Sequence, residues 1–178
     1  MKTNVRNFNV TSIKFFWIIS LAIFFVSFIS PAKVVAQDTK ANFTGTWVTN
    51  TAKSTQSEGN FRGAKQLTVK QEENILNVER LRAGRDGQDM TSKEKITLDG
   101  KECVNDSGRG ASKSVATWSA DGKTLTITTT RSMERNGTKM EMKSSEAWSL
   151  TDAKTLTILS ISQAPNGERK ITLVYDLK

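Results

Sequence analysis

Arginines stand where the sequence is best suited to bind an anion. Three segments carry apolar residues at every second position, and in each segment the same alternation continues into arginine. The residues placed in this way are Arg80, Arg82, Arg131 and Arg169. Alternate side chains of a β-strand share one face, so these arginines are predicted to face the interior. Since a guanidinium group binds a carboxylate or a phosphate through two parallel hydrogen bonds, the sequence predicts an interior site for an anionic head group.

Two methionines are predicted to complete this site. Met140 and Met142 alternate with Glu141 and Lys143, and they share a predicted face with Glu146. The flexible thioether side chain suits an adaptable apolar wall, so we expect the methionines to contact the apolar part of a ligand. The alternative is that twist or a bulge breaks the alternation near the strand ends. In that case the arginines reach water at the rim.

Acid–base and thiol chemistry are the other possibilities that the residues leave open. Glu94 and Glu146 are predicted on inward faces, and paired carboxylates can act as acid and base. Each glutamate can instead pair with a neighbouring arginine or face water. Cys103 is the single cysteine, and the chain has no histidine to activate its thiol. We therefore expect Cys103 to behave as a small, half-buried hydrophobic residue.

The composition excludes several classes of enzyme. The 178 residues include no histidine and one cysteine, which rules out Ser-His-Asp catalysis, histidine-ligated metal or haem, and a site built from several thiolates. Three acidic residues of the predicted loops, Asp86, Asp89 and Asp106, fit no EF-hand spacing. We expect no cofactor, no metal and no enzymatic activity.

The elements that must hold these residues are β-strands. From residue 43 onward the apolar residues alternate with polar ones in segments rich in Thr, Val and Ile, which is typical of half-buried strands. No segment has the apolar stripe of a helix, and the sequence therefore predicts an all-β fold. Ten strands are predicted, over residues 43–50, 65–71, 75–83, 91–98, 101–105, 112–119, 123–132, 138–150, 154–162 and 168–177.

The connections predict an up-and-down antiparallel meander that closes into a barrel. Tight turns such as Asp99-Gly100 alternate with longer loops such as 51–64, and Asp-Gly is a strong hairpin signal. Odd and even connections of a meander lie at opposite ends, so the tight turns gather at one end and the loops at the other. With an even number of strands the first and the last can pair, which removes the exposed sheet edges.

The tight-turn end is predicted to be the packed base of the barrel. Three aromatic residues fall in this half on inward faces, namely Trp118, Trp148 and Tyr175. The motif Asn42-Phe43-Thr44-Gly45-Thr46-Trp47 resembles the first-strand Gly-x-Trp signature of lipocalins, and the chain resembles small secreted bacterial lipocalin-like proteins. The resemblance implies a calycin-type barrel of about eight to ten strands, as in lipocalins and fatty-acid-binding proteins. It also implies a small, usually lipophilic ligand inside, with Gly45 and Trp47 in structural roles at the closed end.

The first 36 residues are predicted to be a secretory signal peptide. A basic start without acidic residues precedes an apolar stretch at 15–29, and Val34-Val35-Ala36 supplies compact residues for cleavage. The stretch is shorter than the roughly 20 residues of a membrane-spanning helix, so we expect no integral span after processing. The single mature domain, residues 37–178, is then secreted or periplasmic.

Removal of the signal peptide halves the positive charge. The full chain has 26 Lys and Arg against 18 Asp and Glu, a formal charge of +8. The predicted signal peptide takes away four basic residues and no acidic one, which leaves +4. Because acidic residues are interspersed throughout and no basic-aromatic stripe is present, nucleic acid is not an expected partner.

Small-ligand binding is the first functional hypothesis: an extracytoplasmic barrel that holds an amphipathic or lipophilic molecule, anionic if the arginines contact it. The alternative is a protein-binding barrel of inhibitor or adaptor type, which uses the long loops at one end. Phe61, an aromatic residue of those loops, and the adjacent Arg62 suit such an interface. An enzyme that uses arginine, glutamate or Cys103 is the third hypothesis.

Overall fold

Ten β-strands account for most of the chain that the structure describes. A computed structural model describes residues 40–55, 63–84, 86–106, 111–135, 138–164 and 167–178, so the predicted signal peptide lies outside the described residues. The strands are β1 (Gly45–Thr49), β2 (Gln66–Glu72), β3 (Ile75–Ala83), β4 (Asp89–Thr97), β5 (Cys103–Asp106), β6 (Ala111–Trp118), β7 (Thr124–Arg135), β8 (Thr138–Asp152), β9 (Thr155–Ala164) and β10 (Gly167–Leu177). Each predicted strand is present, and no boundary differs by more than three residues.

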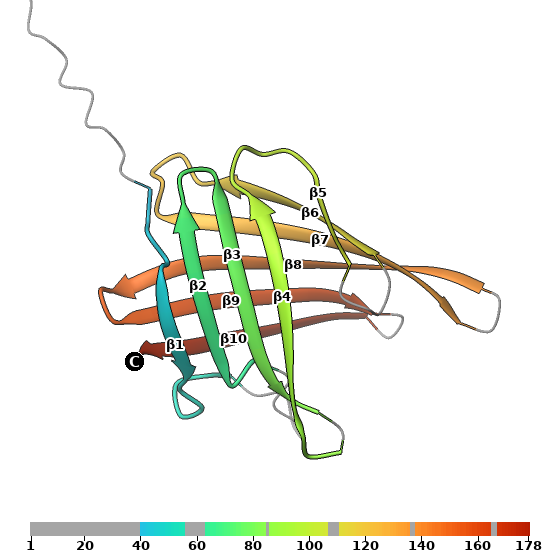
Figure 1. Cartoon of the computed structure of the whole chain (residues 1–178), viewed down its shortest axis with the longest axis horizontal. Coiled ribbons are helices and arrows are strands. Elements are labelled where there is room, and N and C mark those ends of the chain that lie inside the picture. The colour runs from blue at the N-terminus through green and yellow to red at the C-terminus, as the bar shows by residue number, and fades with distance from the viewer. Residues whose placement is uncertain (1–39, 56–62, 85, 107–110, 136–137, 165–166) are drawn as a thin grey trace, which may run out of the picture. The chain divides into compact units, whose positions relative to one another are not determined.

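The strands form one antiparallel sheet that curves into a nearly closed barrel. Its order is β4-β3-β2-β1-β10-β9-β8-β7-β6-β5, so consecutive strands are neighbours and the first strand lies beside the last. The register of β1 and β10 runs from Trp47 opposite Leu177 to Thr49 opposite Tyr175, which confirms the predicted pairing. In Figure 1, β2, β3 and β4 cross in front of the long strands β7 to β10. The fold is the predicted all-β, up-and-down meander.

The packed base of the barrel lies at the tight-turn end, as the alternation predicted. Inward side chains at this end are buried, and the largest of them are Trp47, Trp148, Tyr175, Phe43, Leu67, Leu76, Ile96, Leu125, Leu156 and Ile158. Trp118 is half-buried and packs against this core. Phe43 precedes β1 and covers the base, since its ring stacks on Trp118 at 5.9 Å and meets Trp148 edge-on at 5.8 Å. The base is therefore filled with side chains.

Gly45 and Trp47 fix the start of the first strand. The Trp47 indole donates a hydrogen bond of 2.9 Å to the Phe43 carbonyl oxygen, which holds Phe43 over the core. Gly45 has a φ of 155°. A Cβ at this position would lie 2.6 Å from Cδ1 of Leu177 on the adjacent strand. Both the backbone conformation and the close neighbour favour glycine here.

The barrel wall is interrupted between β4 and β5, the two ends of the sheet. No strand pairing joins them in the described part of the chain. The side-chain amide of Asn105 fills the gap: it accepts a hydrogen bond of 2.8 Å from the Lys95 N–H and donates one of 3.0 Å to the Lys95 carbonyl oxygen. We call this junction the Asn105 seam. β5 has four residues and β4 has nine, so residues 89–93 extend past the described end of β5.

None of the described elements is a helix with the length and hydropathy needed to cross a membrane.

Candidate ligand-binding site

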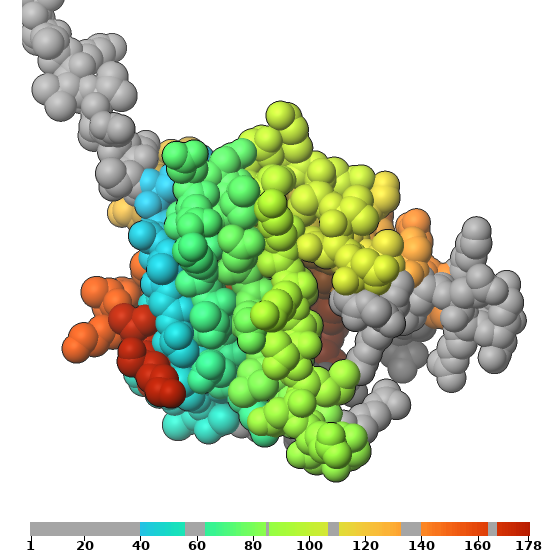
Figure 2. Space-filling view, viewed as in Figure 1, coloured from blue at the N-terminus to red at the C-terminus, as the bar shows by residue number. Residues whose placement is uncertain are grey.

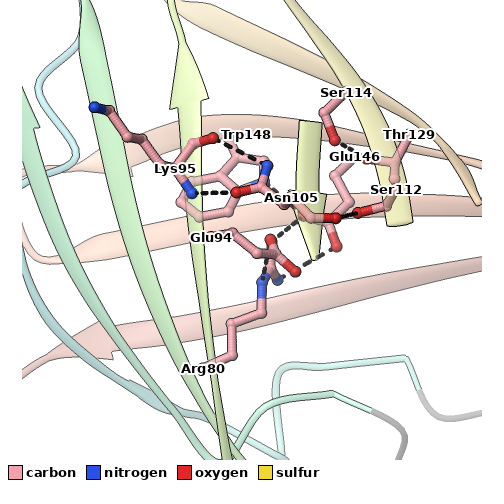
Figure 3. Close-up of polar contacts among 9 residues, drawn as sticks. All are labelled: Arg80, Glu94, Lys95, Asn105, Ser112, Ser114, Thr129, Glu146 and Trp148. Atoms are coloured by element: carbon pink, nitrogen blue, oxygen red, sulfur yellow. Dashed lines mark hydrogen bonds and ion pairs between the residues drawn. The ribbon is translucent and has the colours of Figure 1, made fainter. Parts of the chain in front are cut away.

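A buried ion-pair cluster spans the interior above the base. Arg80 of β3 is 5% exposed. Its Nη2 and Nη1 donate hydrogen bonds of 2.8 and 3.3 Å to the Glu146 carboxylate of β8, and its Nε donates one of 3.3 Å to Glu94 of β4. The guanidinium also lies 5.5 Å from the Trp148 ring centre, and the Trp148 indole donates a hydrogen bond of 3.0 Å to Glu146. Figure 3 shows Arg80 reaching between the two carboxylates. We call Arg80, Glu94 and Glu146 the Arg80 triad.

The contacts of the Arg80 triad favour the charged forms of Arg80 and Glu146, and they bear on the two roles expected for the glutamates. Burial by itself would raise the pKa of Glu146, but attraction to Arg80 and hydrogen bonds from Arg80 and Trp148 hold it below its ordinary value. Burial alone would lower the pKa of Arg80, but the two carboxylates outweigh it and raise it. A glycosidase-type acid needs a raised carboxyl pKa, which Glu146 lacks. The alternative that each glutamate pairs with an arginine is confirmed.

Arg82 and Arg131 stand closer to the loop end than the Arg80 triad. Arg82 is half-buried on β3, where burial and then the like charge of Arg80 lower its pKa. Arg131 is half-buried on β7, and its Nε is buried without a hydrogen-bond partner among the described residues. The Arg80 triad carries one excess negative charge. Arg82 and Arg131 together bring two positive charges to this part of the inner face, so one positive charge remains that no described carboxylate balances.

Hydroxyl side chains line the inner face beside Arg131. Ser114, Thr129, Ser144 and Ser162 lie directly opposite one another on β6, β7, β8 and β9, and we call them the hydroxyl row. The hydroxyls of Ser114 and Thr129 are 2.9 Å apart and share a hydrogen bond. Arg131 is the next inward residue after Thr129 on β7, and it pairs in register with Ser112 and Met142. Cation and hydroxyls thus form one continuous polar surface.

The other predicted site residues lie nearer the rim. Met140 is half-buried, and Met142 is 40% exposed. Arg169 is exposed on β10, where it pairs in register with Ser162 at one end of the hydroxyl row. The structure therefore brings Arg80, Arg82 and Arg131 to the interior. Arg169 is exposed to water, which agrees with the alternative that arginines near strand ends reach water at the rim. Contact of any of these residues with a ligand stays a prediction.

The interior is accessible beside β4. Figure 2 shows dark red atoms of the C-terminal strands deep inside the molecule, next to the light green atoms of β4. A groove of about 410 Å³ lies against β2, β3 and β4, and outward residues such as Lys70 and Lys93 line it together with Glu94 of the Arg80 triad and Asn105. Lys70 and Lys93 are already paired with Glu72 and Glu79. A ligand in this groove would therefore compete with Glu72 and Glu79 for these two lysines.

The remaining candidates carry no built site. Cys103 is half-buried, and its thiol donates a hydrogen bond of 3.3 Å to the Ser114 carbonyl oxygen. Among the described residues no group of three Cys, Asp or Glu side chains could hold a metal ion. Phe61 and Arg62, the predicted protein contacts, lie outside the described residues, so the protein-binding alternative stays a prediction.

Sequence reasoning placed the three members of the Arg80 triad on inward faces and offered arginine pairing as one alternative for the glutamates, but it did not identify Arg80 as the partner that both share. A signal was present, because a charge that is taken out of water needs a partner, and Arg80, Glu94 and Glu146 are all predicted to face inward. The hydroxyl row was also missed. Its four members follow from the same alternation that placed Arg131, once the hydroxyl residues are followed as well as the charged ones.

Comparisons with known proteins give one structural similarity. No family model matches the sequence, and a comparison with curated proteins finds no match. Among solved structures, the chain is similar to a crystal structure of zebrafish ileal bile acid-binding protein complexed with cholic acid, with 13% sequence identity and a TM-score of 0.49. The match covers 76% of this chain and 98% of that chain.

Proposed function

We propose that this protein binds a small amphipathic anion on the inner face of the loop-end half of its barrel, outside the cytoplasm, without catalysing a reaction. The observation that carries the proposal is the buried Arg131 Nε, which has no partner among the described residues and lies beside inward hydroxyls. A buried donor without a partner costs about 1–3 kcal/mol. A bound carboxylate or phosphate would recover that free energy through a charge-assisted hydrogen bond.

Arg82 and Arg131 are the anion contacts in this proposal, and Arg80 forms the floor. Two glutamates already occupy the Arg80 guanidinium, so its positive charge is spent on the Arg80 triad. The base below is filled by buried side chains such as Trp47 and Trp148, which leaves the loop-end half for the ligand. Met140 and Met142 stand above the hydroxyl row on β8, where they would contact the apolar part.

The extracytoplasmic location in the proposal rests on the sequence of the first 36 residues. Its absence of catalysis rests on the lack of histidine and on the lowered pKa of Glu146. Both carboxylates of the Arg80 triad are held by a guanidinium, so neither is free to serve as a base.

Native mass spectrometry and a charge-removal titration test the proposal together. We expect the purified protein to carry a co-purifying small molecule, and the delipidated protein to bind decanoate, followed by tryptophan fluorescence. The double variant Arg82→Met/Arg131→Met should lose at least about tenfold in affinity, since a hydrogen bond to a charged group contributes about 1.5–3 kcal/mol.

The matched control removes two charges from the outer face. Lys93 and Lys113 are exposed and pair with Glu79 and Glu102 on the outside of β4 and β6. The variant Lys93→Met/Lys113→Met should bind decanoate as the wild type does. Equal losses in the two double variants would point to overall charge, and unchanged affinity in Arg82→Met/Arg131→Met would contradict the proposed site.

A further inference from the structure

The inner face next to the arginines is lined by hydroxyl groups, whereas the apolar chain of a ligand would bind best to apolar side chains. Toward the base, the same four strands place Trp118, Leu125, Trp148 and Ile158 in register. Two inward positions closer to the loops, the hydroxyl row replaces all four apolar residues. The change from apolar to polar is therefore complete across β6, β7, β8 and β9 at one level of the barrel.

Part of this polar surface has unused hydrogen-bonding capacity. Ser144 and Ser162 are half-buried, and their hydroxyls have no hydrogen bond to any described residue. Ser160, one inward step from Ser162 toward the base, is in the same state. Across the interior, the Ser92 hydroxyl of β4 is buried without a partner in the described part of the chain. Two independent walls thus present unpaired polar atoms to the same space.

The chemistry of these groups selects the kind of ligand. A hydroxyl is one donor and a double acceptor, so a ligand's hydroxyl groups can make the same hydrogen bonds to it as water does. An alkyl chain laid along the hydroxyl row would remove water from several hydroxyls and give no hydrogen bond in return, which is unfavourable. A ligand with its own hydroxyl groups replaces the lost water contacts, and its carboxylate or phosphate lies within reach of Arg131.

We propose that the ligand is a hydroxylated anion, such as an acidic sugar or its glycoside, whose hydroxyl groups bind the hydroxyl row while its charged group binds Arg131. This inference rests on the proposed function and names the ligand class for the same site. The anionic group is held by Arg82 and Arg131, the hydroxylated body lies on β6 to β9, and any apolar tail lies at Met140 and Met142. A fatty acid, which carries only the anionic group and the tail, is the poorer ligand.

Two probes that differ in the hydroxylated body test the inference. Octyl β-D-glucuronide carries a carboxylate, sugar hydroxyls and an alkyl tail, whereas decanoate carries only a carboxylate and a tail. We expect the wild-type protein to bind the glucuronide at least about tenfold more tightly in fluorescence and NMR titrations, as two or more neutral hydrogen bonds would give. The amide signals of Thr129 and Ser144 should shift with the glucuronide.

A pair of matched variants locates the effect. Thr129 and Ser144 are directly opposite on the inner face of β7 and β8, and Thr128 and Ser145 are directly opposite on the outer face of the same strands. The variant Thr129→Ala/Ser144→Ala should lose about tenfold in glucuronide affinity with decanoate affinity unchanged. The variant Thr128→Ala/Ser145→Ala should change neither affinity.

The failures are distinguishable. Equal wild-type affinity for the two probes would overturn the hydroxylated ligand and leave the arginine site standing. A second result would also overturn the hydroxylated ligand and leave the arginine site standing. In that result the Arg82→Met/Arg131→Met variant loses affinity for both probes, and the inner and outer hydroxyl variants have equal effects. Binding of neither probe would overturn the proposed function itself. If the inner variant does not fold, the wild-type comparison of the two probes still decides the inference.

Discussion

Replacing Arg80 by methionine should destabilise the protein strongly, although the new side chain is apolar and of similar length. Methionine removes the partner of two carboxylates whose side chains are only 23% exposed. Breaking a buried ion pair by removing one partner costs about 3–5 kcal/mol. Because Glu94 and Glu146 keep some contact with water, we expect a value near the lower end, about 3 kcal/mol.

Urea unfolding at pH 7, followed by tryptophan fluorescence, measures this loss. A domain of this size has an m-value of about 1–3 kcal/mol/M in urea, so the midpoint for Arg80→Met should fall by about 1–3 M. The triple variant Arg80→Met/Glu94→Gln/Glu146→Gln should recover most of the loss, because it removes the unpaired charges. This control separates the electrostatic cost from the loss of Arg80 packing on Trp148.

The loss should also depend on pH in a defined direction. Attraction to Arg80 holds the pKa of Glu146 below its ordinary value. Without that attraction burial dominates and raises the pKa, so protonation relieves the strain on the folded variant. The stability difference between wild type and Arg80→Met should therefore be smaller at pH 4 than at pH 7. A loss below about 1 kcal/mol at pH 7, or an equal loss at the two pH values, would refute this account of the Arg80 triad.

Three further predictions concern the acid limb, the seam and the first strand. In the wild type, the contribution of Glu146 is present above its ordinary pKa of 4.5 and is lost as the pH falls toward its lowered folded value; Glu146→Gln should flatten this part of the stability curve, and an unchanged acid limb would contradict the assignment. Asn105→Ala removes both links to Lys95, so we expect a loss of about 1–3 kcal/mol and faster hydrogen exchange at the Lys95 amide; protection equal to wild type would show that other contacts hold the seam. Gly45→Ala places a Cβ 2.6 Å from Leu177 and should lower stability by about 1–3 kcal/mol, measured by thermal unfolding against Gly100→Ala, where a Cβ meets nothing within 4 Å although φ is also positive.

Strand positions could be predicted closely because burial acts on one face at a time. The predicted strand 75–83 coincides with β3, where Leu76, Val78 and Arg80 are buried and their neighbours are not. The alternation holds even for Arg80, because Glu94 and Glu146 on other strands compensate its buried charge. The alternation therefore predicts which side chains face the interior, although it gives no distances between them.

Contacts between strands that are distant in sequence could not be predicted. Arg80 and Glu146 are 66 residues apart, and their meeting depends on how tightly the sheet curves. The role of Asn105 could not be predicted either, because its side-chain amide replaces the backbone hydrogen bonds that a β4–β5 ladder would make. A short strand with an inward asparagine gives no sequence signal that distinguishes this role from an ordinary polar side chain.

The pairing of the first strand with the last has a consequence for how the chain acquires its structure. β1 to β4 and β5 to β10 are two separate meanders, and the ladder between them is made by β1 and β10 over Trp47, Val48 and Thr49. During synthesis, the partner of β1 is the last of the ten strands to be made. The N-terminal meander must therefore wait with one edge exposed until the eleven residues of β10 are present, and such long-range pairing is slow and vulnerable to aggregation. A chain that loses β10 keeps its other hairpins but has no ladder between its halves, so β10 decides whether a barrel forms.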